Sequence, residues 1–98
     1  MVSINFNNDT LRTAISEYLE DEELGIIKYG HINTWKVDGV TDMSHMFKGA
    51  TTFNQSIDKW DVSNVTNMKN MFEHAIIFNQ PLTNWNVGNV TDMEGMLT

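Results

Sequence analysis

Histidine is the side chain best suited to bind a metal ion or to transfer a proton near neutral pH. The chain has 98 residues and three histidines, His31, His45 and His74. A metal site needs several ligands that converge at a fixed spacing, and no second ligand recurs at such a spacing beside these residues. We therefore predict no metal site and no cofactor, and we expect no functional histidine.

Other reactive side chains also lack the neighbours that catalysis requires. The serines stand in no nucleophile-elbow motif, and the chain has no glycine-rich phosphate-binding loop. Asp42, Asp58 and Asp61 could be interpreted as calcium ligands, but no EF-hand or nonapeptide calcium motif surrounds them. We predict no catalytic residue, and we expect that the protein is not an enzyme.

The three tryptophans allow a different chemistry, because indole rings can stack on sugars. They are Trp35, Trp60 and Trp85, so each stands 25 residues after the one before it. The regular spacing favours a structural role, in which each tryptophan marks the same corner of a repeated unit. An aromatic side chain buries about 150–250 Å², which is a large gain for a small core. We therefore expect the indoles to stack inside the protein.

The tryptophans belong to a longer repeat. The three copies begin at these residues and read WKVDGVTDMSHMF, WDVSNVTNMKNMF and WNVGNVTDMEGML, with 6 of 13 positions identical in all three. A period of about 20 to 50 residues is typical of solenoids, propellers and other arrays of stacked units. The sequence therefore predicts that like side chains of successive copies lie on one another.

Each copy is predicted to contain a short amphipathic helix. Its apolar residues have the i, i+3, i+4, i+7 spacing of one helix face, and in the second copy they are Met68, Met71, Phe72 and Ala75. Thr66 stands where an N-cap would accept a backbone N–H. Asp42 and Asp92 would lie in the first turn of their helices, where a carboxylate is favourable.

A short strand is predicted to follow each helix. Phe53, Gln55 and Ile57 alternate with Asn54 and Ser56, which is the period of two expected for a strand. The next copy has a proline in this segment, so its strand must be short or lie at an edge. We expect the Asn-Gln pairs of this segment to bond the backbone or each other between copies.

The predicted fold class is therefore an α/β solenoid, in which each coil of 25 residues contains a short strand, a turn and a short helix. Its interior columns are expected to be Trp35/Trp60/Trp85, Val37/Val62/Val87, Val40/Val65/Val90, Met43/Met68/Met93, Met46/Met71/Met96 and Phe47/Phe72/Leu97.

An additional helix is predicted from Asp9 to Glu23. Its apolar stripe consists of Leu11, Ala14, Ile15, Tyr18 and Leu19. Asn8 or Asp9 can cap this helix, and Gly25 lies just beyond its expected end. Residues 26–29 then lead into the first coil as an irregular strand. Residues 1–30 are thus predicted to cover the first coil, and residues 31–98 to form about two and a half repeats of one continuous domain.

The motif W-x-V-x-x-V-T-x-M-x-x-M-F-x-x-A-x-x-F-N-Q, found from Trp35 to Thr98, resembles the bacterial surface-protein repeat family. This family is also described as BspA-like or mycoplasma-lipoprotein-type repeats. The segment KYGHI from Lys28 is similar to the start of such proteins. The resemblance implies leucine-rich-repeat-like coils, a cell-surface or secreted location in a microbe, and a role in adhesion or protein binding. This chain departs from the family pattern because it ends inside the third predicted helix.

The composition narrows the range of partners. The net charge is −7 and the pI is about 4.6, and such an acidic surface repels phosphate backbones and anionic lipids. We therefore predict no nucleic-acid binding. No apolar run approaches the roughly 18 residues of a membrane span, and the first residues show no signal-peptide pattern. The absence of cysteine excludes disulfides without fixing the compartment.

These observations favour a protein-binding module, which presents varied residues over a fixed interior. The candidate partner-binding residues are Lys36, Asp38, Lys59, Asp61, Lys69, Asn70, Glu73 and Asn86. An alternative is a structural spacer, or a fragment of a longer array, with no ligand of its own. The third coil has no end piece, so we expect that further repeats follow it or that its open side pairs with another molecule, self-association included.

Overall fold

The computed structural model describes residues 4–96, and all of the helices in this range precede Trp35, the first residue of the repeat motif. Helix α1 spans Asn8–Glu20, helix α2 spans Glu22–Tyr29, and the 3-10 helix η1 spans Ile32–Thr34. Within the described residues, strand pairing is limited to three isolated parallel bridges, Asn5 with Lys36, Asp42 with Asn67, and Asn67 with Asp92. The protein is thus a compact globule of 34 × 26 × 23 Å, and its described residues form two α-helices, one short 3-10 helix and almost no strand. Neither of these helices has the length and apolar character that a bilayer span requires.

The predicted N-terminal helix is confirmed, but its two ends differ from the prediction. Its N-cap is Asn7, whose side-chain oxygen accepts the N–H groups of Asp9 and Thr10 at 2.9 and 2.8 Å. The helix ends at Glu20, and the backbone becomes extended at the C-cap residue Asp21. The side chain of Asp21 then accepts the N–H of Leu24 at 3.2 Å and starts α2. A single helix to Glu23 is therefore wrong, because one aspartate ends α1 and caps α2.

Helix α2 also replaces the irregular strand predicted for residues 26–29. Gly25, which was expected beyond a helix end, lies inside α2 and against α1. A Cβ atom at Gly25 would lie only 2.8 Å from the Cα atom of Tyr18. The two helices can therefore pack this closely only because residue 25 has no side chain.

Ionic and hydrogen-bonded contacts around Glu17 join the two helices. The Nζ atom of Lys28 lies 2.9 Å from a carboxylate oxygen of Glu17, and the hydroxyl of Tyr29 donates to the other oxygen. The bond from Lys28, together with that from Tyr29, holds the pKa of Glu17 below its ordinary value.

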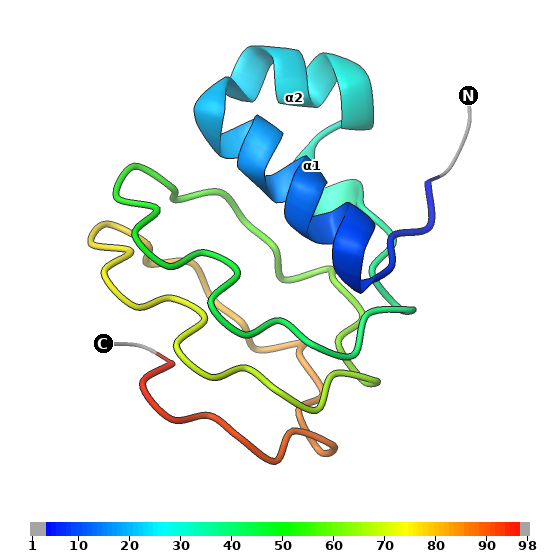
Figure 1. The fold of residues 1–98 in the computed structure, drawn as a ribbon, viewed down its shortest axis with the longest axis vertical. Helices are drawn as coiled ribbons and strands as arrows, with labels where there is room; N and C mark the ends of the chain where they lie inside the picture. The colour runs from blue at the N-terminus through cyan, green and yellow to red at the C-terminus, as the bar shows by residue number, and fades with distance from the viewer. Residues whose placement is uncertain (1–3, 97–98) are drawn as a thin grey trace.

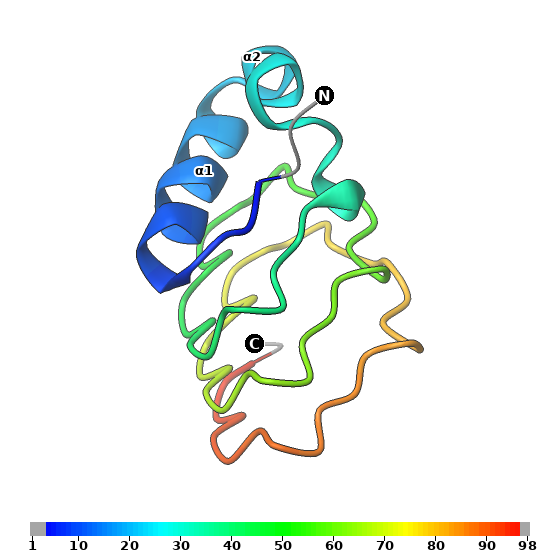
Figure 2. The same cartoon turned by 90° about the vertical axis from the view of Figure 1, so that its right-hand side faces the viewer.

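Three coils of chain lie one below another beneath α1 (Figures 1 and 2). We define coil 1 as residues 32–56, coil 2 as residues 57–81 and coil 3 as residues 82–96. Their backbones bond in register, since Thr66 N donates to Thr41 O and Thr91 N donates to Thr66 O, both at 2.8 Å. Seven more bonds of 2.8–2.9 Å run from one coil to the next, with the donors Met43, His45, Phe47, Gly49, Met68, Asn70 and Phe72.

The short helix predicted in each copy is wrong. Left-handed φ angles interrupt the segment at His45 and Gly49 of coil 1, and at the corresponding Asn70 and His74 of coil 2. Successive turns replace the helix, for example where Met46 N donates to Met43 O at 3.3 Å. The apolar side chains still point inward. The alternate N–H groups are free to bond the next coil, whereas a helix would use them internally.

The predicted strands and helix caps are also wrong, because turns take the place of the helices. Neither copy of the Phe-Asn-Gln segment forms a strand. Asp42 and Asp92 accept the N–H groups of the residues two positions later, at 2.9 and 3.0 Å, as in an Asx-turn. The hydroxyl of Thr66 donates to Thr41 O at 3.2 Å. The Asn-Gln pairs do bond between coils as predicted, because Gln80 Nε2 donates to Asn54 O at 3.0 Å.

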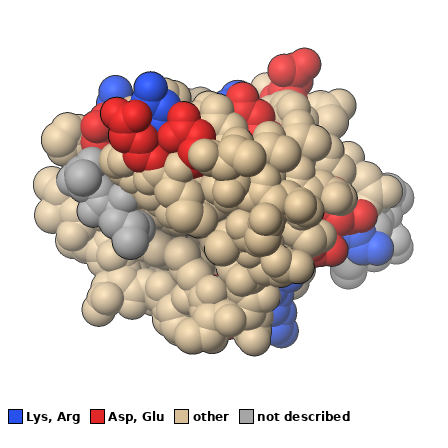
Figure 3. Space-filling view, turned by 90° about the horizontal axis from the view of Figure 1, so that it is seen from below, with Lys and Arg blue, Asp and Glu red and all other residues tan. Residues whose placement is uncertain are grey.

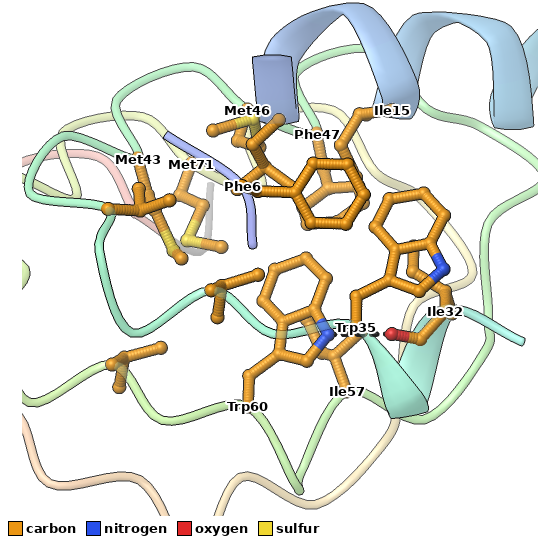
Figure 4. Close-up of a cluster of buried hydrophobic side chains, with 14 of the residues drawn as sticks. Phe6, Ile15, Ile32, Trp35, Met43, Met46, Phe47, Ile57, Trp60 and Met71 are labelled. Atoms are coloured by element: carbon orange, nitrogen blue, oxygen red, sulfur yellow. Dashed lines mark hydrogen bonds between the residues drawn. The ribbon is translucent and has the colours of Figure 1, made fainter. Parts of the chain in front are cut away.

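The interior columns of coils 1 and 2 are confirmed. Trp35 and Trp60 stack with ring centroids 6.5 Å apart (Figure 4). Phe47 and Phe72 stack at 5.4 Å. The repeat residues buried in these two coils are Trp35, Val37, Val40, Met43, Met46, Phe47, Trp60, Val62, Val65, Met68, Met71 and Phe72.

Coil 3 is less covered than its neighbours. Met93 is 44% exposed, whereas Met43 and Met68 are fully buried. Trp85 is half-buried and has Phe72, rather than Trp60, as its ring neighbour at 6.5 Å. The prediction for Leu97 lies outside the described residues. Burial of the columns therefore depends on a coil or helix on each side.

Gly25→Ala tests the close packing of α1 and α2. The new methyl group must displace Tyr18, so we expect a loss of about 1–3 kcal/mol in the free energy of unfolding, measured by urea denaturation. Gly88→Ala is the matched control, since the nearest atom to its new Cβ is the flexible Asn86 side chain at 3.1 Å. The control should change stability by less than about 0.5 kcal/mol, and equal effects would contradict the packing argument.

Trp60→Phe tests the tryptophan column. The indole is 2% exposed, and its N–H donates to Ile32 O at 2.7 Å. The substitution leaves a cavity and removes that bond, so we expect a loss of about 2–3 kcal/mol in urea denaturation. Trp85→Phe removes an equivalent bond of 2.9 Å to Ile57 O from a half-buried position, and it should cost less than half as much.

Candidate functional site

Four of the predicted binding residues surround one shallow hollow of about 440 Å³. They are Lys36 and Asp38 of coil 1 and Lys59 and Asp61 of coil 2. We call this feature the lysine–aspartate hollow. Asn5, Asn33, Thr34, Trp35 and Val37 complete its lining. The hollow thus joins residues of the chain before α1 with residues of two successive coils.

Turns of the coils place these four side chains on the surface. Val40 N donates to Val37 O at 2.9 Å, and the turn between them carries Asp38 outward. A second turn, closed by Trp60 N and Ile57 O at 3.1 Å, carries Lys59 outward in the same way. Lys36 and Asp61 each stand between an inward tryptophan and an inward valine, so they face solvent. The repeat therefore aligns Lys36 with Asp61, and the two turns add Asp38 and Lys59 beside them.

Three of the four charged side chains of the hollow are unpaired in the part of the chain that the structure describes. Lys36, Asp38 and Lys59 are exposed, and their side chains make no ion pair or hydrogen bond within residues 4–96. Asp61 differs, since Ser63 donates to its carboxylate from the hydroxyl at 2.6 Å and from the backbone N–H at 3.0 Å. These bonds, the one from the Ser63 side chain first, lower the pKa of Asp61.

Asn86 occupies the third position of the column that begins with Lys36 and Asp61. Its side chain accepts the N–H of Gly88 at 3.0 Å, which is the turn that Asp61 forms with Ser63. It does not line the hollow. The outward column thus changes from a cation to an anion to a neutral amide over three coils.

The other three predicted residues lie away from the hollow, where the coils bond through their backbones. Lys69 O accepts from coil 1, and Asn70 N donates to coil 3. Asn70 is one of the residues with left-handed φ, at 53°. Glu73 forms an ion pair with Lys48 at 3.2 Å. The structure therefore does not bring these three residues together with the four of the hollow.

Sequence reasoning missed the uncharged residues of the hollow, of which Asn33 is the most informative. Its side-chain oxygen accepts Lys59 N at 3.0 Å and so fixes the turn that carries this lysine. Asp58, 25 residues later, accepts Asn84 N at 3.1 Å in the same way. The 25-residue offset between Asn33 and Asp58 is the pattern that could have revealed this role.

The hollow combines charges of both signs with amide groups. Two ammonium groups and two carboxylates line a hollow whose uncharged residues include two asparagines. Such a set can bind opposite charges and amide groups of another molecule. Among residues 4–96, no group of three or more histidines and carboxylates is arranged to hold a metal ion.

Ser63→Ala tests the local electrostatics of Asp61. Loss of the hydroxyl bond should raise the pKa of Asp61 part of the way to its ordinary value, because the backbone bond remains. An NMR titration of the Asp61 carboxylate measures the shift, and Ser56→Ala is the control that should leave it unchanged. Because the folded-state pKa is lowered, Asp61 stabilises the fold above its unfolded pKa. This contribution is lost as the pH falls through the folded value.

Comparisons with known proteins place this chain in a family without assigning an activity. A family model described as "Mycoplasma protein of unknown function, DUF285" matches residues 13–98. No curated protein and no solved structure matches the chain. The matched range starts within α1 and includes every repeat, so the chain belongs to the family of Mycoplasma proteins of unknown function DUF285.

Proposed function

We propose that this protein is a non-enzymatic repeat module that binds another protein through the lysine–aspartate hollow. One observation carries the proposal. The inward columns repeat the same residues and are buried in coils 1 and 2, while the outward column beside them changes from Lys36 to Asp61 to Asn86. Repeat proteins commonly recognise partners with varied residues on a constant scaffold.

The finer fold assignment is part of the same proposal. The bonds between residues 25 positions apart support coils of a leucine-rich-repeat-like solenoid, even though their local conformation is a series of turns. The same motif supports a relationship to the BspA-like surface-protein repeats. From that relationship we infer a cell-surface or secreted location and a role in adhesion.

The charges of the hollow indicate what kind of partner it binds. Lys36 and Lys59 lie beside Asp38 and Asp61, so the local charges balance while the whole chain has a net charge of −7. A polyanion such as nucleic acid would gain little here and would be repelled at long range. A protein surface with charges of both signs fits this hollow best.

A binding experiment with host-matrix and cell-surface proteins tests this function. For a partner that binds saturably, Lys36→Ala and Lys59→Ala should each weaken binding about fivefold, or about 1 kcal/mol, in surface plasmon resonance. Lys69→Ala is the matched control, because it removes an equal charge at a site away from the hollow. It should change the affinity by less than about twofold.

The outcomes separate the alternatives. Equal losses in all three variants would show a general effect of charge and would contradict the hollow as the site. The absence of any saturable partner would instead favour a structural spacer with no ligand of its own. Concentration-dependent dimers in sedimentation experiments would favour self-association through coil 3.

A further inference from the structure

The two sides of a coil carry different backbone groups. On the side that faces the next coil, Met43 donates its N–H to Asn67 O at 2.9 Å. Its own carbonyl cannot face that coil, because it accepts Met46 N within a turn. The same holds for His45, whose N–H bonds coil 2 while its carbonyl accepts Lys48 N. We call this side, which is rich in N–H groups, the donor side, and the opposite side the acceptor side.

Helix α1 covers the acceptor side of coil 1. The guanidinium of Arg12 donates to Ser44 O at 2.8 Å and to Asp42 O at 3.4 Å. The counterparts of these carbonyls in coil 2 are Lys69 O and Asn67 O, and both accept N–H groups of coil 1. Arg12 therefore supplies the donors that a preceding coil would supply.

A second side chain of α1 completes this cover. Thr66 N bonds Thr41 O of the preceding coil, whereas Thr41 N bonds the side-chain oxygen of Asn8 at 2.9 Å. Asn8 Nδ2 also donates to the Thr41 hydroxyl at 3.0 Å. The side chains of α1 thus take the place of a preceding coil and occupy its binding groups.

The donor side of coil 3 has no such cover among the described residues. Met93 N, the counterpart of Met43 N and Met68 N, donates no hydrogen bond within residues 4–96. The valine columns are only partly covered in coil 3. Val87 and Val90 are half-buried, whereas their counterparts in coils 1 and 2 are at most 1% exposed. Figure 3 views the molecule from this side, and the charged side chains lie near the rim of a largely uncharged face.

We propose that the donor side of coil 3 binds a further coil of the same 25-residue pattern, through its acceptor side. Such a coil would present carbonyls to Met93 N and apolar side chains to Trp85, Val87 and Val90. It would continue the contact that already joins coils 1 to 2 and 2 to 3. A second copy of this chain does not reproduce this contact, because its own donor side also presents an N–H group at Met93. In coils 1 and 2 the carbonyls that accept Met43 N and Met68 N belong to the opposite side of the next coil. Within residues 4–96, the acceptor sides of coils 2 and 3 bond the preceding coil, and that of coil 1 is covered by Arg12 and Asn8 of α1.

An extended chain tests the proposal. A second copy of residues 74–98 is fused after Thr98, so that the 25-residue register continues. The control fusion carries the same 25 residues in scrambled order. Hydrogen exchange is read at the amide of Met93, and the amides of Met43 and Met68 serve as internal references. We expect the repeat fusion to slow exchange at Met93 at least tenfold and to raise the midpoint of thermal unfolding, and the scrambled fusion to do neither.

Each other result contradicts the proposal. Equal protection of Met93 in both fusions would show that any added tail covers the site. A repeat fusion less stable than the original chain would show that coil 3 rejects a further coil. In the unextended chain, protection of Met93 that grows with protein concentration would make a second copy the occupant.

Discussion

The hydrogen bonds that run from the N–H groups of one coil to the carbonyls of the next are the constraint on which this structure depends. The described chain after Thr34 contains no helix and no paired strand beyond isolated bridges. Its buried backbone groups must nevertheless find partners, because an unpaired buried group costs about 1–3 kcal/mol. The next coil provides these partners at 2.8–2.9 Å. This bonding fixes the 25-residue register, and the register in turn places like side chains on one another.

The same register explains how a small core can bury tryptophan side chains, whose indole N–H groups need hydrogen-bond acceptors. Each indole N–H points to a carbonyl three residues before the equivalent tryptophan, so Trp60 bonds Ile32 O and Trp85 bonds Ile57 O. Trp35 has no earlier coil above it and bonds Gly30 O at the end of α2 instead. The end of α2 therefore supplies to Trp35 the acceptor that the preceding coil supplies to Trp60 and Trp85. Among the described residues, no buried side-chain nitrogen or oxygen lacks a partner.

The sequence predicts the inside of this protein better than its local conformation. Burial follows residue type and period, so the valine, methionine and tryptophan columns were identified correctly in coils 1 and 2. The helix prediction failed because two successive turns give the same i, i+3, i+4, i+7 apolar spacing as a helix. The residues at the turn positions, His45 and Asn70 in one column and Gly49 and His74 in another, could have revealed the difference. Asparagine, histidine and glycine adopt left-handed φ more readily than most residues.

The sequence predicted the candidate site only in part, because two of its charged residues belong to one outward column and the other two belong to separate turns. Lys36 and Asp61 are adjacent members of one outward column, so a 25-residue alignment brings them together. Asp38 and Lys59 come from different turns of different coils, and Asn33 enters through a backbone bond to Lys59. Their meeting depends on the direction in which coil 2 follows coil 1. Coil 2 lies on the donor side of coil 1, because the backbone bonds between the two coils form there. A pattern of residue types does not show which side of a coil carries the N–H groups. In such a scaffold, outward residues such as Lys36, Asp61 and Asn86 can differ without disturbing the bonds between coils, because most of these bonds join backbone groups.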